Sequence, residues 1–400
     1  MWIYSSRLTT LNEGYATHMS AKSTIRKFLK EESASGLLLI FGAILGLILA
    51  NAPTADFYKS ILAKGFTIDL PLFYLSLTVT KVINYLLMSL FFFVVGMEIK
   101  REVISGHLSS IKKAAAPFVA ALGGMALPAI IYLAIAGSEA RNGWAIPVAT
   151  DIALAVGVLA LMGSRVSFAM KTFLLALAVI DDIGAIAIIA FFYSDNLALN
   201  WLATGLITFT YILLSYKKGF SNRFITALLA LLLWYSFYRA GIHPTLAGVL
   251  LGFALPQSEA LEERLHPWSS FLVVPIFALA NTGVEVSLDS IKSAATSSIA
   301  IAIFAALVIG KPLGIFAFTK IFTKRKLAES PEQNGKLDLV ATGSAAGIGF
   351  TVSIFIAKLA FKEQSLQDLA IVAVIFASLL SALLSFALFK GPFNKSARDI

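Results

Sequence analysis

Residues 175–192 read LALAVIDDIGAIAIIAFF, an apolar run in which the adjacent acids Asp181 and Asp182 are the only charged residues. A segment of this length and apolarity is typical of a helix that crosses a lipid bilayer, which requires roughly 20 mostly apolar residues. A charged side chain at the centre of such a helix costs about 2.5 to 3.5 kcal/mol. The run therefore predicts a membrane span whose two carboxylates need an explanation.

The whole chain has the composition of a membrane protein. Of its 400 residues, 58% are hydrophobic and 14% are charged, whereas about 25% of residues are charged in soluble domains. We expect an all-α transporter domain over residues 35–390, between a tail at 1–34 and a tail at 391–400. Apolar segments predict twelve spans at about 35–51, 76–98, 114–136, 144–162, 169–193, 197–216, 221–239, 243–255, 268–287, 295–319, 338–360 and 366–390.

The basic residues predict the orientation of these spans. Most of the 32 Lys and Arg residues fall in the tails and in alternate loops on one side. Because cytoplasmic loops retain positive charge, both termini are predicted to be cytoplasmic, and the net charge of +9 reflects topology rather than nucleic-acid binding. The first residues lack the apolar core of a signal peptide, and either Met1 or Met19 can be the natural start.

Several classes of activity have no motif in this chain. There is no cysteine, which excludes disulfides and thiolate metal sites. The patterns HExxH, GxxxxGK[ST] and GxGxxG do not occur, so neither zinc hydrolysis nor nucleotide-driven pumping is indicated.

Four ionisable side chains lie deep in predicted spans: Asp151, Asp181, Asp182 and Lys311. A structural ion pair between one aspartate and Lys311 would neutralise two of them. The remaining acids leave an excess of buried negative charge, which takes up a proton or attracts a cation. Neighbouring helix residues point about 100° apart. We therefore expect one of the adjacent aspartates to bind a transported ion, and the other to pair with Lys311 or carry a proton.

Two predicted spans contain residues that interrupt helices. Proline removes a backbone donor, and each glycine weakens a helix by about 1 kcal/mol relative to alanine. We expect both helices to unwind in mid-membrane, where exposed backbone and the Thr150 hydroxyl can supply oxygen ligands for a cation; the alternative is that the glycines only permit close helix packing. The interrupting residues are Pro147 in 144–162 and Gly343, Gly347 and Gly349 in 338–360.

The interrupted spans are the middle members of two triplets, at about 113–193 and 294–390. Seven spans separate the starts of the triplets, and an odd number inverts the topology, so the pattern predicts inverted repeats. The ends of half-helices carry partial charges, positive at N-termini and negative at C-termini. Asp151 and Lys311 have the signs needed to neutralise such ends.

Long stretches of the chain, from about residue 22 to 390, resemble the NhaA family of bacterial sodium/proton antiporters. The resemblance implies an NhaA-like fold in the bacterial inner membrane, with two broken helices that cross at mid-membrane. It implies exchange of Na⁺ or Li⁺ for H⁺, with no enzymatic activity and no cofactor. The stretches that carry it are FFFVVGMEIKRE, VATDIALAVGVLAL, LALAVIDDIGAIAIIA, GIHPTLAGVLLGF, LHPWSSFLVVPIFALANTGV, GKPLGI and GIGFTVSIFIAKLAF.

The resemblance also implies roles for individual residues. Asp182 matches the carboxylate that binds sodium and protons, Asp181 matches its partner, which pairs with the lysine at Lys311, and Thr150 and Asp151 match the residues at the helix crossing. The residues that match the pH-sensing set are Glu98, Lys100, Arg101, Glu102, Glu262 and His243. The chain departs from the family near this set, so the pH threshold does not carry over; the departing residues are Tyr85, Glu259, Ala260 and Glu263.

Alternatives remain at this stage. Residues 53–74 resemble a periplasmic hairpin used for dimerisation, but an extended loop fits equally well, and the charges of MEIKRE and LEER are ordinary for a solvated loop. An intramembrane aspartyl protease using Asp151 and Asp181 would require a GxGD motif, which does not occur. A passive cation channel with acids lining its pore would dissipate an ion gradient without moving protons against it.

Overall fold

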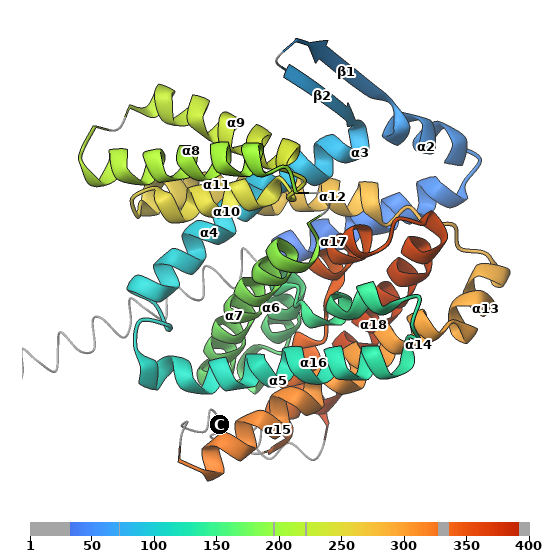
Figure 1. The fold of residues 1–400 in the computed structure, drawn as a ribbon. Helices are drawn as coiled ribbons and strands as arrows, with labels where there is room; N and C mark the ends of the chain where they lie inside the picture. Colours follow the sequence, from blue (N-terminus) through green and yellow to red (C-terminus); the bar gives the residue numbers. More distant parts are fainter. Residues whose placement is uncertain (1–32, 72, 195–196, 221, 327–335, 392–400) are drawn as a thin grey trace, which may run out of the picture.

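The computed structural model describes residues 33–71, 73–194, 197–220, 222–326 and 336–391, and this part of the chain is almost entirely helical (Figure 1). The predicted tails at 1–34 and 391–400 fall almost wholly outside these ranges. The elements, in chain order, are a first helix Ser33–Asn51, α2 (Ala55–Ala63), β1 (Gly65–Leu70), β2 (Phe73–Thr78), α3 (Val79–Lys81), η1 (Val82–Leu87), α4 (Met88–Ile104), α5 (Ile111–Ile135), η2 (Arg141–Val148), α6 (Ile152–Leu161), η3 (Gly163–Arg165), α7 (Phe168–Phe192), α8 (Leu199–Lys217), α9 (Arg223–Ala240), α10 (Thr245–Ala254), α11 (Glu259–Trp268), η4 (Ser269–Val273), α12 (Val274–Asn281), α13 (Leu288–Thr296), α14 (Ser298–Ala305), η5 (Ala306–Gly310), α15 (Lys311–Lys324), α16 (Lys336–Ala346), α17 (Phe350–Ala360) and α18 (Gln364–Lys390).

Within the described ranges, eight helices are long and apolar enough to cross a membrane, and the bent pair α16 and α17 makes up to nine. The other predicted spans are helical but fall short of this measure. Helix α9 carries an arginine near each end, α10 has only 10 residues, and the helix through α11, η4 and α12 begins with charged residues. The helix that contains most of the predicted span 268–287 begins at Glu259, after the cap Ser258, and ends with α12 at Asn281, so its bounds differ from those of the predicted span at both ends.

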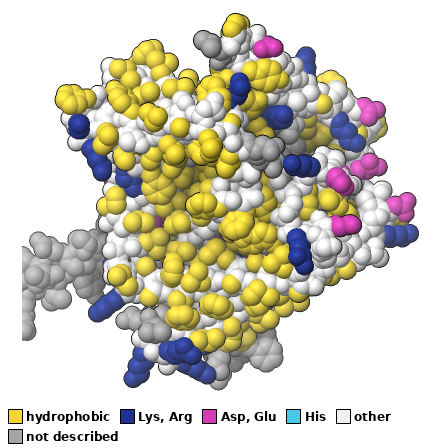
Figure 2. Space-filling view, viewed as in Figure 1, with side chains coloured by type: hydrophobic (Ala, Val, Ile, Leu, Met, Phe, Trp, Pro, Cys, Tyr) yellow, Lys and Arg dark blue, Asp and Glu magenta, His cyan; other side chains and the backbone are white. Residues whose placement is uncertain are grey.

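The surface of the molecule is that of a protein in contact with lipid. Figure 2 shows hydrophobic side chains over most of one face, with a group of Lys and Arg side chains at its lower edge near α15. On α8, Leu199 and Ile207 are 72% and 70% exposed. Exposed side chains of this type are stable in a bilayer but unfavourable in water over so large an area. The protein is therefore a multi-pass membrane protein.

The helices form two packed groups (Figure 1). Helices α4, α8, α9, α10 and α12 pack together in one group, and α5 to α7 pack with α14 to α18 in the other. The second group contains both predicted triplets. Apolar side chains from α4, α10, α12, α17 and α18 form a continuous buried cluster where the groups meet.

Helices α5 and α15 approach each other through glycines. A Cβ atom on Gly123 would lie 2.2 Å from the Gly314 carbonyl oxygen, and a Cβ on Gly314 would lie 2.1 Å from the Gly123 carbonyl oxygen. Small residues of this kind allow membrane helices to pack backbone against backbone. The contact fixes α15 one helical turn from Lys311, whose side-chain stem passes 3.8 Å from the Cβ position of Gly124.

We therefore predict that Gly314→Ala destabilises the protein by about 1 to 3 kcal/mol, because the added methyl group has no space at the crossing. Gly157 is a matched control in α6, since its Cβ would meet only the Ser33 Cα at 3.9 Å. Gly157→Ala should be neutral or stabilising by up to about 1 kcal/mol. Thermal unfolding in detergent measures both, and equal stability of the two variants would contradict the packing described.

A π-helical turn, η5, directly precedes Lys311. Pro312 has no N–H group, so the carbonyl of Val308, four residues earlier, loses its usual helical partner. Widened turns of this type are rare and are found frequently at functional sites. The Lys311–Pro312 sequence thus alters the helix locally at the residue whose charge needs a partner.

Strands β1 and β2 form an antiparallel hairpin in which Thr67 pairs with Ser76 and Asp69 with Tyr74. The hairpin spans Gly65–Thr78, whereas the segment expected to form it was 53–74, and the first part of that segment is the helix α2. Tyr235 on α9 accepts from the Tyr74 N–H at 2.9 Å and donates to the Tyr74 carbonyl at 3.2 Å. Tyr238 makes the equivalent pair of bonds to Ser76, at 3.3 and 3.1 Å.

Candidate functional site

Both interrupted helices are broken in the structure, and the two breaks touch. The 3₁₀ helix η2 contains Pro147 and ends at Val148, and α6 begins after an extended Asp151. Helices α16 and α17 meet at a bend of 48° around Gly347 to Gly349. The backbone N–H of Asp151 donates to the Ile348 carbonyl at 2.7 Å. Backbone groups that a break would leave unpaired in lipid are thus paired across the crossing.

Asp151 lies where two helices begin. Its Oδ1 accepts from the Leu154 N–H at 3.1 Å, and its Oδ2 accepts from the Thr351 N–H at 3.1 Å and the Thr351 hydroxyl at 2.5 Å. Leu154 lies in the first turn of α6 and Thr351 in the first turn of α17. A carboxylate at a helix N-terminus is stabilised by the partial positive charge there. Asp151 therefore neutralises two N-termini at once.

Lys311 lies at the opposite kind of helix end. Its Nζ donates to the carbonyl of Val148, the last residue of η2, and is 3.0 Å from Asp181 Oδ2. The Thr150 Oγ1 is 2.7 Å from the same Asp181 oxygen and 3.0 Å from the Ala346 carbonyl. Asp181, Lys311 and Thr150 are each 0% exposed. Asp181 and Lys311 therefore form a buried ion pair. The Thr150 hydroxyl donates to Asp181, and the Val148 carbonyl accepts from Lys311.

Asp182 has different surroundings from Asp181. A cavity of about 530 Å³ lies between α4, α6, α7 and α11, and Asp182 lines it together with Asp151 and Thr351, whereas Asp181 does not. The Asp182 side chain is 7% exposed and forms no hydrogen bond or ion pair with another described residue. A buried carboxylate in this position can be neutralised by a proton or by a cation that reaches it through the cavity.

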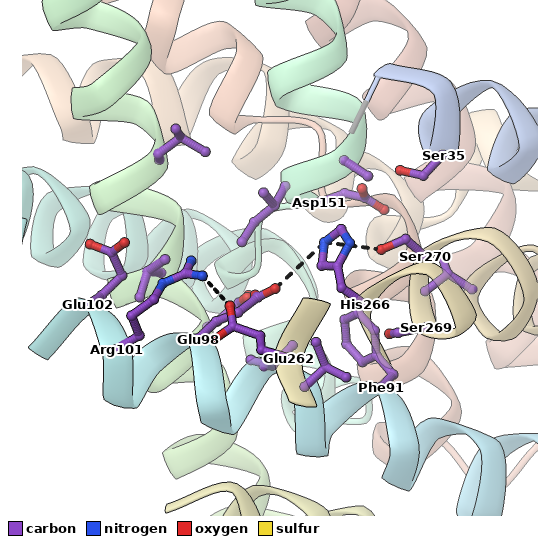
Figure 3. A pocket seen from close by; sticks show the side chains of 18 of the residues that line it. Ser35, Phe91, Glu98, Arg101, Glu102, Asp151, Glu262, His266, Ser269 and Ser270 are labelled. Carbon is purple, nitrogen blue, oxygen red and sulfur yellow. Dashed lines mark hydrogen bonds and ion pairs between the residues drawn. The ribbon is translucent and has the colours of Figure 1, made fainter. Parts of the chain in front are cut away.

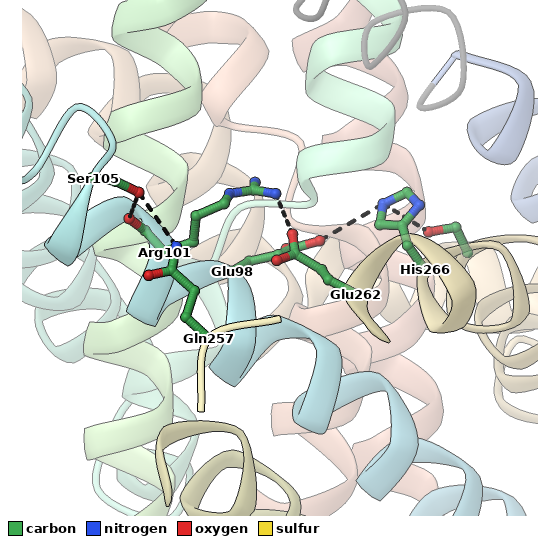
Figure 4. A network of polar contacts seen from close by, with 7 residues as sticks. Glu98, Arg101, Ser105, Gln257, Glu262 and His266 are labelled. Atoms are coloured by element: carbon green, nitrogen blue, oxygen red, sulfur yellow. Dashed lines mark hydrogen bonds and ion pairs between the residues drawn. The ribbon is translucent and has the colours of Figure 1, made fainter. Parts of the chain in front are cut away.

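The outer part of the cavity is lined by charged residues from two helices. Figure 3 shows Glu98, Arg101 and Glu102 on α4 and Glu262 and His266 on α11, directed toward the space between the helices. Arg101 pairs with Glu262, and His266 Nε2 lies 3.7 Å from Glu98 Oε1. Figure 4 shows that the network extends to Gln257, whose Nε2 is 3.4 Å from the Ser105 hydroxyl.

Two residues of the expected pH-sensing set do not line this cavity. The Nζ of Lys100 donates to the carbonyls of Phe253 at 2.9 Å and of Leu255, so it caps the C-terminal end of α10. His243 is buried between the rings of Tyr85 and Phe355, whose centroids lie 5.0 and 4.9 Å away.

Two histidines of the cavity were missed by the sequence analysis. His266 follows Glu262 by four residues, the spacing that places two side chains on one helix face. His107 follows Glu102 by five residues, and its ring Nδ1 lies 3.2 Å from Glu102 Oε2. The His266 spacing was a usable signal, but the contact of His107 depends on how the chain turns after α4.

Burial raises the pKa of Glu262 above its ordinary value, and the charge of Arg101 opposes this effect. The folded state therefore holds this proton more tightly than the unfolded chain. The resulting stabilisation is present at low pH and is lost as the pH rises above the ordinary range of a glutamate. We predict that thermal stability in detergent falls less between pH 4 and 7 in Glu262→Gln than in the wild-type protein. Parallel stability curves for the two proteins would contradict this assignment.

Among the described residues there is no group of three or more His, Cys, Asp or Glu side chains able to hold a metal ion. The crossing offers a carboxylate, hydroxyls and backbone carbonyls, which are the oxygen ligands that hard cations prefer.

The sequence of this chain is similar to those of known proteins. The sequence model of the family described as Na⁺/H⁺ antiporter 1 matches residues 26–389. The Na(+)/H(+) antiporter NhaA of Shewanella frigidimarina is 42% identical over 374 residues, which cover 90% of this chain and 95% of that protein. NhaA 2 of Erythrobacter litoralis is 43% identical over 398 residues, covering 95% and 98%. NhaA 1 of Clostridium beijerinckii is 41% identical over 381 residues, covering 92% and 95%.

These relatives are Na⁺/H⁺ antiporters, which are transporters rather than enzymes. The ions that they carry are their substrates, and antiporters of this family need no cofactor. The match extends across both triplets and both broken helices. With identity above 40% over nine tenths of the sequence, this chain belongs to the NhaA family of Na⁺/H⁺ antiporters.

Proposed function

We propose that this protein is a pH-regulated, electrogenic antiporter that extrudes Na⁺ or Li⁺ from the cytoplasm in exchange for periplasmic protons. The observation that carries the proposal is the different placement of the two adjacent aspartates. Asp181 is paired with Lys311, whereas Asp182 faces the cavity and has no partner among the described residues. This difference supports Asp182 as the group that exchanges its proton for a cation.

In this proposal the cation and the proton compete for Asp182. Deprotonated Asp182 binds Na⁺ from the cavity, and a proton from the other side of the membrane later displaces the ion. Asp181 alternates between Lys311 and a proton, since its Oδ1 is buried without a hydrogen-bond partner in the described structure. Asp151, Thr150 and Lys311 hold the broken helices together at the crossing.

Alternating access requires one group of helices to move against the other. We propose that the moving group consists of the inverted repeats 113–193 and 294–390, within a domain of twelve spans over 35–390. The reciprocal contact of Gly123 and Gly314 supports this, because α5 and α15 occupy corresponding places in the two triplets. The breaks beside Pro147 and at Gly347 to Gly349 meet where the Asp151 N–H donates to the Ile348 carbonyl, next to residues that line the cavity.

We propose that regulation by pH acts through the charged outer part of the cavity. The groups are Glu98, Arg101, Glu102 and Glu262, to which the family resemblance adds Lys100 and His243. If protons outnumber Na⁺ in each cycle, turnover responds to membrane voltage by about 2.3 kcal/mol per net charge per 100 mV. The excess of Lys and Arg on one side supports an inner-membrane orientation with both termini in the cytoplasm, so that the cavity opens to the cytoplasm.

The proposal is tested with everted, respiring membrane vesicles that contain the protein and an acid-trapped fluorescent dye. Na⁺, Li⁺ or K⁺ is added at several pH values. Antiport predicts recovery of fluorescence on addition of Na⁺ or Li⁺, with a pH threshold. A cation channel would instead dissipate an imposed Na⁺ gradient in vesicles without an opposing proton gradient. The protease alternative predicts peptide cleavage and no response of the dye.

We further propose that two copies associate through the β-hairpin. Tyr235 and Tyr238 occupy the outer backbone groups of β2, so the edge of β1 is the side of the hairpin left for a partner strand. All six residues of β1 are exposed. An exposed edge of this kind pairs readily with another strand.

The backbone N–H of Ser76 in β2 points away from β1 and donates to Tyr238. Thr67 lies opposite Ser76 in β1, and in such an antiparallel pair both residues direct their N–H groups away from each other, so the Thr67 N–H points away from β2. We predict that Thr67→Pro removes an outward donor without removing a bond of the hairpin, and shifts the protein from dimer to monomer in light scattering. Thr67→Val keeps the N–H and removes only the hydroxyl contact to Ser76, so it should remain dimeric. Equal masses for the two variants would argue against pairing at this edge.

A further inference from the structure

The cavity that contains Asp182 ends at an apolar layer. Helices α4, α12 and α17 each contribute a valine to its lining and, one turn further from the charged outer part, a phenylalanine that does not line it. Each phenylalanine is three residues from its valine, and all three are at most 4% exposed. The pairs are Val95 and Phe92 on α4, Val274 and Phe277 on α12, and Val352 and Phe355 on α17.

Phe355 joins the two groups of helices within this layer. Its ring centroid lies 5.6 Å from that of Phe92, 6.1 Å from that of Phe277 and 4.9 Å from that of His243. These three rings come from α4, α12 and the residues just before α10, in the first group, whereas α17 belongs to the second group and packs on α12 (Figure 1). Phe355 therefore fills a pocket whose walls belong to the other group.

The same helix connects this ring to the crossing. Thr351, which bonds Asp151 and lines the cavity, precedes Phe355 by four residues, the spacing that places two side chains on one helix face. A path that continues from the cavity along this face of α17 meets the Phe355 ring next. Apolar constrictions of this kind stop ions, because water and hydrated ions are excluded from them.

We propose that Phe355 is the residue that closes the ion path on the side opposite the charged outer part of the cavity. The ring must leave the pocket formed by Phe92, Phe277 and His243 before Asp182 is exposed on that side. Phe355 does not contact the transported ion; it acts by blocking the path and by holding the two groups of helices together. The inference rests on the proposed function, since it assigns one step of the proposed alternating access to this side chain.

The test measures access to the cavity from each side of the membrane. The chain has no cysteine, so one introduced thiol reports access without background, and Val95→Cys places it in the cavity lining. A membrane-impermeant cationic thiol reagent is added, without Na⁺, to everted vesicles and to right-side-out vesicles that contain the full-length protein. With Phe355 intact, labelling should be fast in everted vesicles, which expose the outer part of the cavity, and slow in right-side-out vesicles.

In the Val95→Cys background, Phe355→Ala should raise the labelling rate in right-side-out vesicles by at least about tenfold. Aromatic pairs contribute a factor of about two to ten each to an equilibrium, and the variant loses three of them. Phe355→Leu keeps a large apolar side chain and should raise the rate by about twofold or more, but less than Phe355→Ala. Labelling in everted vesicles should not change, which shows that the cavity is still formed.

Phe389→Ala is the matched control. Phe389 is also 1% exposed, but it packs in an apolar cluster that lies wholly within the second group of helices, so its loss should leave both labelling rates unchanged. If Phe355→Ala is not recovered as folded protein, the comparison of Phe355→Leu with Phe389→Ala decides.

Unchanged labelling in right-side-out vesicles, or equal increases in the Phe355 and Phe389 variants, would overturn the inference. Because labelling is measured without Na⁺, it does not depend on transport. Absence of Na⁺-dependent proton flux in the wild-type protein would instead overturn the proposed function.

Discussion

Asp182→Asn is expected to abolish Na⁺-dependent proton flux in everted vesicles, with a loss of at least about 100-fold. Removing a group that must bind and release a proton in each cycle has effects of about this size or larger. The asparagine has nearly the same shape as aspartate but cannot carry the charge that binds Na⁺ or the proton that replaces it. Because Asp182 lines the cavity without a partner, no described hydrogen bond or ion pair is lost in the variant.

Asp69→Asn provides the matched control. Asp69 lies in the exposed strand β1, far in sequence from the crossing, and its pairing partner is Tyr74. This variant should transport at the wild-type rate. A second measurement separates binding from folding: Na⁺ should raise the unfolding temperature of the wild-type protein and of Asp69→Asn, but not of Asp182→Asn, because a ligand stabilises only a state that binds it. Retention of Na⁺-dependent flux by Asp182→Asn would exclude Asp182 as the coupling site.

Lys311→Met is expected to destabilise the folded protein by about 3 to 5 kcal/mol, the usual result of removing one member of a buried charge pair. Methionine preserves much of the volume of the side chain, so the main effect is electrostatic. It leaves the carboxylate of Asp181 buried at 0% exposure, and leaves the Val148 carbonyl without its donor. Thermal unfolding of the purified protein in detergent measures the effect.

The charge explanation is tested by a second substitution in the same chain. Asp181→Asn removes the charge that Lys311→Met leaves uncompensated, so the double variant should recover most of the lost stability, although neither protein should transport. Lys292→Met, on the exposed part of α13, is the matched control and should change stability by no more than about 0.5 kcal/mol. If the double variant is no more stable than Lys311→Met alone, packing rather than charge holds Lys311 in place.

Much of the architecture follows from composition and periodicity. Long apolar segments predicted a helical membrane protein, and the described structure confirms this although fewer helices than twelve meet the criteria of length and apolarity. The predicted helix breaks are found beside Pro147 and at Gly347 to Gly349. The prediction was wrong for Gly343, which lies inside α16 and provides space for the close approach of Pro312. These features are local, since a bilayer requires apolar side chains over a fixed length, and proline and glycine act on the backbone where they occur.

Local patterns were less informative wherever a contact joins distant segments. Lys100 lies in a charge-rich motif, but its partners are the carbonyls that end α10, more than 150 positions later. The edges of the hairpin were misplaced because α2 and β1 are both short. His107 reaches Glu102 only through the turn at Gly106.

The sequence by itself determined that charges are buried in the membrane and that Asp181 and Asp182 must have different partners, because adjacent residues on a helix point in different directions. Helix geometry alone did not determine which of them faces Lys311 and which faces the cavity, and the assignment of Asp181 to Lys311 came only from the family resemblance. That depends on the rotation of α7 in the bundle and on the crossing that places Val148, Thr150 and Lys311 around Asp181. Only the tertiary structure decides this, because a buried charge is neutralised by groups that are close in space, and these come from three different segments of the chain.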